Sequence, residues 1–207
     1  PHDFRVRLGS VRYAEDAEVD DSLGRSVGVF DAWEQTGVET RSAMLELAAD
    51  YLEKDRSRFM AVLVREAGKT IQAAHDEVRE AVDFLRFYAA DARRVLSAPI
   101  DFKSPTGETN TLHLRGRGPF AIICPWNFPL AILAGQAAAA LVAGNPVLIK
   151  PSEHTPIMGQ MVTELLHRAG APGDVVQLLV GDGLLGDRLV RDPRVAGVAF
   201  TGSIETA

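Results

Sequence analysis

Four short, unbroken apolar runs in the second half of the chain limit the folds that are open to it. FAIIC, PVLI, VVQLLV and GVAF begin at positions 120, 146, 175 and 197, and segments long enough for helices separate them, at 130–143, 155–169 and 183–191. Strands without polar alternation are buried on both faces, which is typical of parallel sheets covered by helices. The pattern predicts βαβ units in an α/β, doubly wound, Rossmann-like sheet at 119–207.

The first half of the chain has helical periodicity instead. After a loose acidic opening, apolar residues recur three and four positions apart over 38–54, 56–66 and 71–92, which predicts three amphipathic helices. On the third helix we expect Asp76, Glu77, Arg79 and Arg86 to lie off the apolar stripe. Prolines and an alternating TLHLRGRG predict an extended, oligomerisation-type hairpin at 98–118, which leaves a helical part at 1–97.

Composition argues against several classes of function. The net charge is −6 and no basic run is interleaved with aromatics, so we expect no nucleic acid partner. The longest apolar segment, 130–143, is too short to span a membrane, and five histidines without ligand spacing predict no metal. The single cysteine, Cys124, is expected to be a buried thiol and fits a cytoplasmic location. The first residue, Pro1, suggests a cut from a longer chain.

Glycine motifs suggest phosphate binding at two places. GDGLLG at 181–186 matches the dinucleotide fingerprint, but it follows the third predicted strand, so a plain strand-to-helix turn explains it equally well. FTGS at 200–203 follows the last strand, where a helix N-terminus could hold a pyrophosphate or Ser203 could be an ordinary N-cap. GKT at 68–70 lacks the earlier glycine of a P-loop and is excluded.

Two other motifs lie where parallel strands should end, which is where open α/β sheets bind ligands. In KPSE at 150–153, Lys150 and Glu153 could grip ribose hydroxyls, or Glu153 could sit in the first turn of a helix with Lys150 solvated. In PWNFP at 125–129, two prolines hold the chain away from helix until about residue 130. Asn127 is thereby placed at the sheet edge, to stabilise a developing negative charge or to satisfy turn backbone groups.

Taken in order, these motifs resemble the N-terminal part of an aldehyde dehydrogenase. The matching blocks are PWNFPL at 125–130, GNP at 144–146, KPSE with TP at 150–156, and FTGS at 200–203. Within that family, REAGKT at 65–70, EVREAVDF at 77–84 and GPFAIICP at 118–125 resemble the L-glutamate-γ-semialdehyde (1-pyrroline-5-carboxylate) dehydrogenase module of bifunctional proline-utilisation enzymes.

The resemblance implies NAD-dependent oxidation of L-glutamate γ-semialdehyde to L-glutamate, the second step of proline catabolism, through a cysteine thiolate. It makes Asn127 the oxyanion donor, with Phe128 beside the aldehyde chain. Glu80 would hold the substrate's amino group, although an ordinary exposed helix carboxylate remains the alternative. Glu153 would disfavour the 2′-phosphate of NADP. The implied NAD-binding residues are Ile123, Pro125, Trp126, Lys150, Ser152, Glu153, Gly183, Phe200, Thr201, Gly202 and Ser203.

In the family, the nucleophilic cysteine and the general-base glutamate lie downstream of a position like Ala207. We therefore expect this chain to be an incomplete, inactive NAD-binding part that exposes apolar surface, and the complete protein to be a homo-oligomer. FAD is expected only if a proline dehydrogenase domain precedes Pro1. Two alternatives stay open: a catalytically silent dinucleotide-binding or assembly module, and a dehydrogenase for another ω-semialdehyde.

Overall fold

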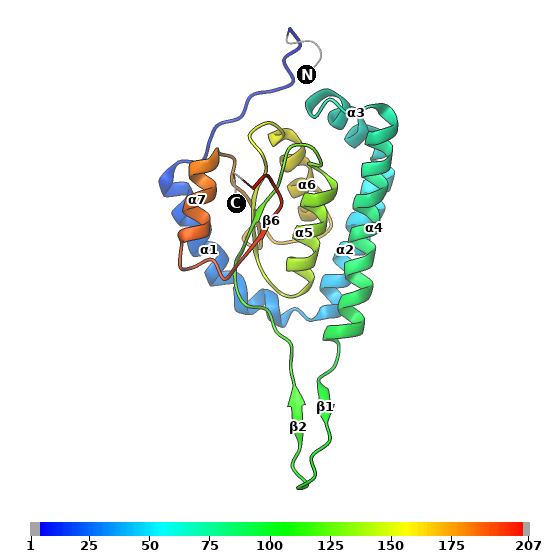
Figure 1. The fold of residues 1–207 in the computed structure, drawn as a ribbon, viewed down its shortest axis with the longest axis vertical. Coiled ribbons are helices and arrows are strands. Elements are labelled where there is room, and N and C mark those ends of the chain that lie inside the picture. The colour runs from blue at the N-terminus through cyan, green and yellow to red at the C-terminus, as the bar shows by residue number, and fades with distance from the viewer. Residues whose placement is uncertain (1–4, 205–207) are drawn as a thin grey trace.

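The structure, a computed structural model, describes residues 5–204 (Figure 1). Its helices and strands follow the predicted order of helices, hairpin and alternating strands. The helices are α1 (Asp16–Gln35), α2 (Val38–Lys54), α3 (Arg56–Glu66), α4 (Ile71–Leu96), α5 (Ala131–Val142), α6 (Pro156–Arg168) and α7 (Gly183–Arg191). The strands are β1 (Ile100–Phe102), β2 (Asn110–Leu112), β3 (Phe120–Ile123), β4 (Val147–Lys150), β5 (Val176–Leu178) and β6 (Gly197–Phe200).

The parallel sheet has the strand order β5-β4-β3-β6. Numbered along the chain from β3, the strands have the order 3-2-1-4 of a doubly wound sheet. The strands β4 and β5 are added on one side of β3 and β6 on the other, so the strand order reverses between β3 and β6. The register pairs Ile123 of β3 with both Lys150 and Phe200. Three strands therefore end level with one another at the point where the order reverses. The predicted α/β fold class is confirmed.

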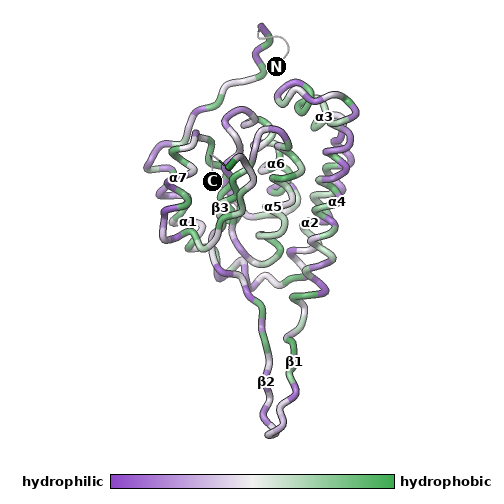
Figure 2. Tube along the Cα trace, in the orientation of Figure 1, coloured by the Kyte–Doolittle hydropathy of each residue, from purple (hydrophilic) through white to green (hydrophobic). Residues whose placement is uncertain are grey.

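Alternate strand residues supply two cores on opposite faces of the sheet. Ile122 and Ile149 belong to the larger core, which includes residues of α2, α4, α5 and α6. Ala121 and Leu148 belong to a smaller core with residues of α1 and α7. Figure 1 shows α1 and α7 on one side of the sheet and α5 on the other, with α2 and α4 beyond α5. Figure 2 shows apolar residues along the central strand β3 and polar residues on the outer surfaces of α1, α4 and α7.

Helix α1 is the main departure from the sequence prediction, because residues 16–35 lie in what was expected to be a loose opening. Leu23 and Val19 are buried against the sheet, and the buried Gln177 of β5 donates hydrogen bonds to the Ser22 carbonyl and the Ser26 hydroxyl, at 2.9 and 2.7 Å. These partners lie about 150 residues away in the sequence. Tertiary contacts therefore stabilise a helix that contains two glycines and several aspartates.

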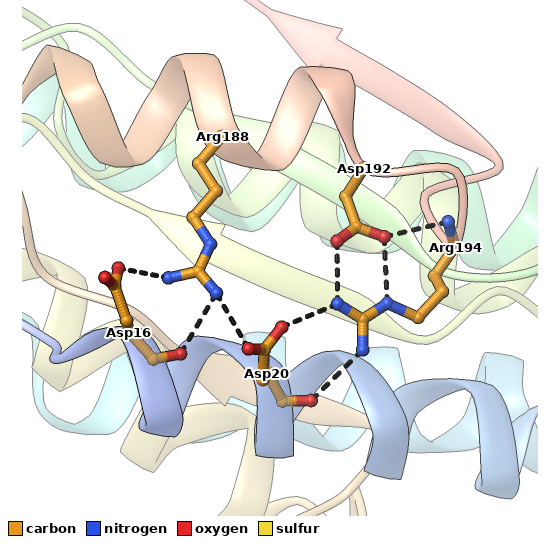
Figure 3. A network of polar contacts seen from close by, with 5 residues as sticks. All are labelled: Asp16, Asp20, Arg188, Asp192 and Arg194. Atoms are coloured by element: carbon orange, nitrogen blue, oxygen red, sulfur yellow. Dashed lines mark hydrogen bonds and ion pairs between the residues drawn. The ribbon is translucent and has the colours of Figure 1, made fainter.

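A polar network on the outer surface also joins α1 to α7 (Figure 3). Asp20 of α1 accepts from Arg188 of α7 at 3.1 Å and from Arg194 at 2.8 Å, and Arg188 also pairs with Asp16. Arg194 pairs in turn with Asp192, at the end of α7, and its guanidinium lowers the pKa of that carboxyl to about 2. Ion pairs this exposed each stabilise a fold only slightly, but together they fix how the two helices lie side by side.

The segment between α4 and β3 forms the predicted hairpin, which projects from the body (Figure 1). β1 and β2 pair antiparallel with Ile100 opposite Leu112. Because side chains alternate along a strand, Ile100, Phe102, Leu112 and Leu114 lie on one face, and each is between 43% and 55% exposed. The hairpin thus carries an uncovered apolar strip. No helix within residues 5–204 is both long and apolar enough to cross a membrane.

Cys124, directly after β3, is a buried thiol, as predicted. The residue is 5% exposed, and its thiol donates to the Gln136 side-chain oxygen at 3.2 Å. Burial raises the pKa of the thiol to about 12, although the nearby Lys150 ammonium opposes this effect. The thiolate is therefore scarce at neutral pH.

We predict that iodoacetamide at pH 8 alkylates Cys124 about 1000-fold more slowly in the folded protein than in the urea-unfolded protein, because the thiolate reacts and burial suppresses it. Mass spectrometry over time measures both rates. The sequence has a single cysteine, so the label reports on this residue alone. Rates within tenfold of each other would show that the thiol is accessible and ionised.

Candidate functional site

The turn after β3 presents Asn127 at the carboxyl edge of the sheet. Pro129 is buried and α5 begins at Ala131, so the prolines delay the helix as predicted. Trp126 and Phe128 are 54% and 41% exposed, and Asn127 between them is exposed too. Within residues 5–204 the Asn127 side chain makes no hydrogen bond, so the alternative that it satisfies turn backbone groups is wrong. Its amide is available to a ligand.

A carboxylate from α4 holds the far side of this turn. Glu77 is 1% exposed, and one of its carboxylate oxygens accepts from the backbone N–H groups of Leu130 and Ala131, at 2.8 and 3.2 Å. These are the first N–H groups of α5, which have no partner inside a helix. We expected Glu77 to lie off the buried stripe, and that was wrong. Its burial could have been predicted from its spacing, because it lies three residues after Ala74 and four before Ala81, which are both buried.

Lys69 completes the arrangement around Glu77. Its ammonium lies 2.6 Å from the second oxygen of Glu77 and 3.7 Å from the centre of the Phe128 ring. Among residues 5–204, that second oxygen has no hydrogen-bond donor besides this ion pair. The lysine side chain is 10% exposed. A helix, α3, precedes Lys69, where a P-loop would need a strand, as the missing glycine predicted. The contact of Lys69 with the Asn127 turn was not predicted, because nothing in the local sequence indicates it.

Lys150, at the end of β4, is buried next to α7. It is 5% exposed, so the alternative of a solvated lysine is wrong. Its ammonium lies 3.9 Å from a Glu153 carboxylate oxygen, and its stem is so close to α7 that a Cβ at Gly186 would lie 3.7 Å from it. Burial lowers the pKa of Lys150, against the opposing effect of Glu153 and Asp182.

Glu153 is exposed in the turn before α6, and not in the first turn of that helix as the alternative required. Ser152 is buried, and its hydroxyl accepts from the His154 N–H at 3.3 Å, so it shapes this turn. Trp126 and Glu153 both line one surface hollow of about 730 Å³, together with Arg65 and the segment 7–11. Two residues predicted to bind the cofactor are thereby brought together.

The helices that follow β3, β4 and β5 all have carboxylates at their N-termini. Glu77 occupies that of α5, and Glu66 occupies that of α6 by accepting from Ile157 and Met158, at 2.8 and 2.9 Å. Burial raises the pKa of Glu66, and these two bonds oppose the rise. Asp182 caps α7 by accepting from Leu184 at 2.9 Å. A pyrophosphate would therefore meet a negative charge at each of these three helix starts.

The turn after β6 has a different character. The Thr201 N–H donates to the Ile123 carbonyl at 3.1 Å, and the Thr201 hydroxyl accepts from the Gln136 amide at 2.8 Å. Gly202 lies against the Phe200 ring so closely that a Cβ would come within 2.6 Å of it. Ser203 follows, and the helix expected to begin here lies outside the described residues. Gly183, by contrast, simply begins α7, where a Cβ would meet no other group.

A groove of about 530 Å³ runs between α4 and α5 and ends at this turn. Glu80, Phe84, Ile132, Gly135, Gln136 and Thr201 are among its lining residues. Gly135 makes room for Phe84, since a Cβ there would lie 3.0 Å from the ring. Glu80 is exposed and lines the groove, whereas Phe128 does not line it and faces Lys69. Gln136, which sequence reasoning missed, stands out as a polar residue in the apolar run of α5.

The carboxyl edge of the sheet therefore brings together the Asn127 amide, the ion pair of Lys150 with Glu153, the turn after β6, and an apolar groove lined by Glu80. No group of three or more His, Cys, Asp or Glu residues in the described part of the chain could hold a metal.

Comparison with known proteins agrees with this geometry. The model of the aldehyde dehydrogenase family matches residues 3–207. The chain is 47% identical over 201 residues to "Bifunctional protein PutA" of Klebsiella aerogenes, covering 97% of this chain and 14% of that protein. It is 37% identical over 198 residues to "1-pyrroline-5-carboxylate dehydrogenase" of Bacillus subtilis (strain 168), covering 95% of this chain and 38% of that protein.

A crystal structure of bifunctional proline utilization A (PutA) superposes with a TM-score of 0.94 at 44% identity, over 96% of this chain and 20% of that one. The chain thus spans well under half the length of the relatives that it matches. The extent of the family match and the agreement in fold show that the chain belongs to the aldehyde dehydrogenase family.

Proposed function

We propose that this chain is the cofactor-binding part of an NAD-dependent enzyme that oxidises L-glutamate γ-semialdehyde to L-glutamate in proline catabolism. The observation that carries the proposal is the level edge of β3, β4 and β6, which places the Asn127 turn, Lys150 with Glu153, and Thr201 at one reversal of strand order. Similarity to proteins named 1-pyrroline-5-carboxylate dehydrogenase supports the substrate. A cytoplasmic location and a homo-oligomer that covers the apolar strip of the hairpin are part of the proposal.

NAD supplies the hydride acceptor when it is bound. Lys150 and Glu153 would hold the hydroxyls of the adenosine ribose, because the pair offers a donor and an acceptor 3.9 Å apart at a strand end. Glu153 would repel a 2′-phosphate and so favour NAD over NADP. The pyrophosphate would lie at 201–203, since carboxylates occupy the other three helix starts.

Asn127 would act on the aldehyde oxygen. Its side-chain amide can donate a hydrogen bond to this oxygen as the carbonyl carbon is attacked and the oxygen becomes negative. Cys124 is unsuited to the attack because it is buried and its pKa is raised to about 12. The nucleophilic thiolate is proposed to come from the segment that follows residue 207 in complete members of the family.

Glu80 and the groove between α4 and α5 would define the substrate. The groove walls are largely apolar, and Glu80 is the carboxylate among the residues that line it, which suits an aliphatic aldehyde with an ammonium group. If Glu80 does not bind that ammonium, the same groove would suit another ω-semialdehyde.

A second candidate function is a catalytically silent dinucleotide-binding or assembly module. The burial and the raised pKa of Cys124, the one cysteine in the sequence, favour it. Cys124 cannot serve as the nucleophile, so the chemistry depends on a residue from elsewhere. Activity in the complete protein separates the two candidates, because a silent module would bind NAD without oxidising aldehydes.

The catalytic role of Asn127 is tested by Asn127→Ala in the complete enzyme. We expect kcat to fall about 100- to 1000-fold, as when one oxyanion donor is lost, while the Kd for NAD stays within twofold. Steady-state kinetics and NAD titration measure the two quantities. Gln160→Ala, which removes an exposed side-chain amide from α6, is the matched control. A kcat within threefold of the unsubstituted enzyme would refute the role of Asn127.

The substrate assignment is tested by Glu80→Gln in the same enzyme. Losing a charge-assisted contact should raise KM for L-glutamate γ-semialdehyde about tenfold and leave KM for glutaric semialdehyde, which lacks the amino group, unchanged. Asp83→Asn removes an exposed carboxylate from the same helix and serves as the control. Equal effects on both aldehydes, or no effect on either, would contradict recognition of the ammonium by Glu80.

A further inference from the structure

We propose that Lys69 and Glu77 are a positioning pair that fixes the Asn127 turn and thereby sets where the Asn127 amide points. The proposal rests on the function proposed for Asn127 and adds the residues that hold it. Neither residue needs to touch the substrate. Lys69 touches one side of the turn and Glu77 the other, and the two are joined by an ion pair of 2.6 Å.

The backbone around Lys69 is itself fixed. Gly68 has a positive φ of 72°, and the Lys69 N–H donates to the Leu63 carbonyl at the end of α3, at 3.3 Å. The next residue, Thr70, caps α4 by accepting from the Ala73 N–H at 3.1 Å. Held by α3 on one side and α4 on the other, Lys69 has a defined starting point for its side chain.

Glu77 fixes the backbone that follows Asn127. Its two bonds reach Leu130 and Ala131, three and four residues beyond Asn127. The helices α4 and α7 are capped by short side chains of their own, Thr70 and Asp182. At α5 the capping position is Leu130, which has no capping side chain, so the cap comes from a helix more than fifty residues earlier. The start of α5, and hence the turn before it, is tied to α4.

Lys69 fixes the side of the turn next to Asn127. Its ammonium lies over the ring of Phe128, the residue that directly follows Asn127, at 3.7 Å. Such contacts strengthen when the cation is removed from water, and the Lys69 side chain is only 10% exposed. The Glu77 side chain is fully buried. Loss of either member leaves the other as an uncompensated buried charge, so the pair acts as one unit.

The pair also sets a distance that matters to the proposed reaction. Glu80 follows Glu77 by three residues, so the two lie about one turn apart on neighbouring positions of α4. By gripping the Asn127 turn, Glu77 places the proposed oxyanion donor relative to the helix that carries the proposed ammonium-binding acid. A shift of about 1 Å in such an arrangement can lower a rate about 100-fold.

The test is a double-mutant cycle in the complete enzyme between Lys69→Met and Asn127→Ala, with kcat for aldehyde oxidation as the readout. If Lys69 acts through Asn127, Lys69→Met should lower kcat about 10- to 100-fold in the unsubstituted enzyme and less than twofold in the Asn127→Ala background. Lys69→Arg, which keeps the charge and the ring contact, should recover most of the lost rate. Arg79→Gln, which breaks an exposed ion pair on α4, should change nothing.

The outcomes separate this inference from the proposed function. Equal losses from Lys69→Met in both backgrounds, or no loss in either, would overturn the positioning role. If Asn127→Ala alone leaves kcat unchanged, the proposed function fails. Amide hydrogen exchange at Leu130 and Ala131 then tests the positioning pair by itself. Lys69→Met should accelerate that exchange at least tenfold relative to Arg79→Gln. Unchanged exchange would show that the pair does not hold the turn. Should Lys69→Met not fold, Glu77→Gln, which removes the charge that pairs with Lys69 but keeps an acceptor oxygen for both N–H groups, replaces it in the kinetic cycle with the same expected losses. In the exchange measurement Glu77→Leu, which removes the acceptor, replaces it with the same expected acceleration.

Discussion

The structure depends on carboxylates that occupy the N-termini of the helices after the parallel strands. In doubly wound sheets the helix that follows the first strand ordinarily offers its free N–H groups to a phosphate. Here Glu77 takes those groups at α5, Glu66 takes them at α6, and Asp182 takes them at α7. The usual phosphate-binding position, at the start of α5, is therefore occupied by the protein's own Glu77 carboxylate. The proposed dinucleotide would therefore use the turn after β6 and the ion pair at the end of β4.

Helix α4 connects the parts of the site. It packs along α2 and α5, and along its length it carries the Thr70 cap, the buried Glu77 and the exposed Glu80. The Asn127 turn has little internal support, since its two prolines remove backbone donors. Support from α4 lets an exposed turn keep one conformation while its amide stays free. The same helix layer therefore serves both the stability of the core and the geometry of the proposed reaction.

The sequence predicted the strands and most of the helices because both signals are local. Unbroken apolar runs specify buried strands, and the three- and four-residue spacing specified α2, α3 and α4 closely. Helix α1 could not be predicted in this way, because its stability comes from Gln177 and from Arg188 and Arg194, far along the chain. The motifs that contain Asn127, Lys150 and Thr201 were expected at strand ends, and the structure places all three at one sheet edge; their roles remain predictions. The burial of Glu77 and its pairing with Lys69 depend on how α4 meets α5, which a local pattern does not contain.

The central claim is that this sheet edge is an NAD site with Glu153 at the adenosine ribose. Isothermal titration of the protein with NAD and NADP, with and without Glu153→Gln, tests it most directly, and Glu164→Gln on the exposed side of α6 is the control. The account predicts saturable binding of NAD, binding of NADP at least about tenfold weaker, and a much smaller difference in Glu153→Gln. Absence of saturable NAD binding, or a preference that Glu153→Gln leaves unchanged, would contradict it.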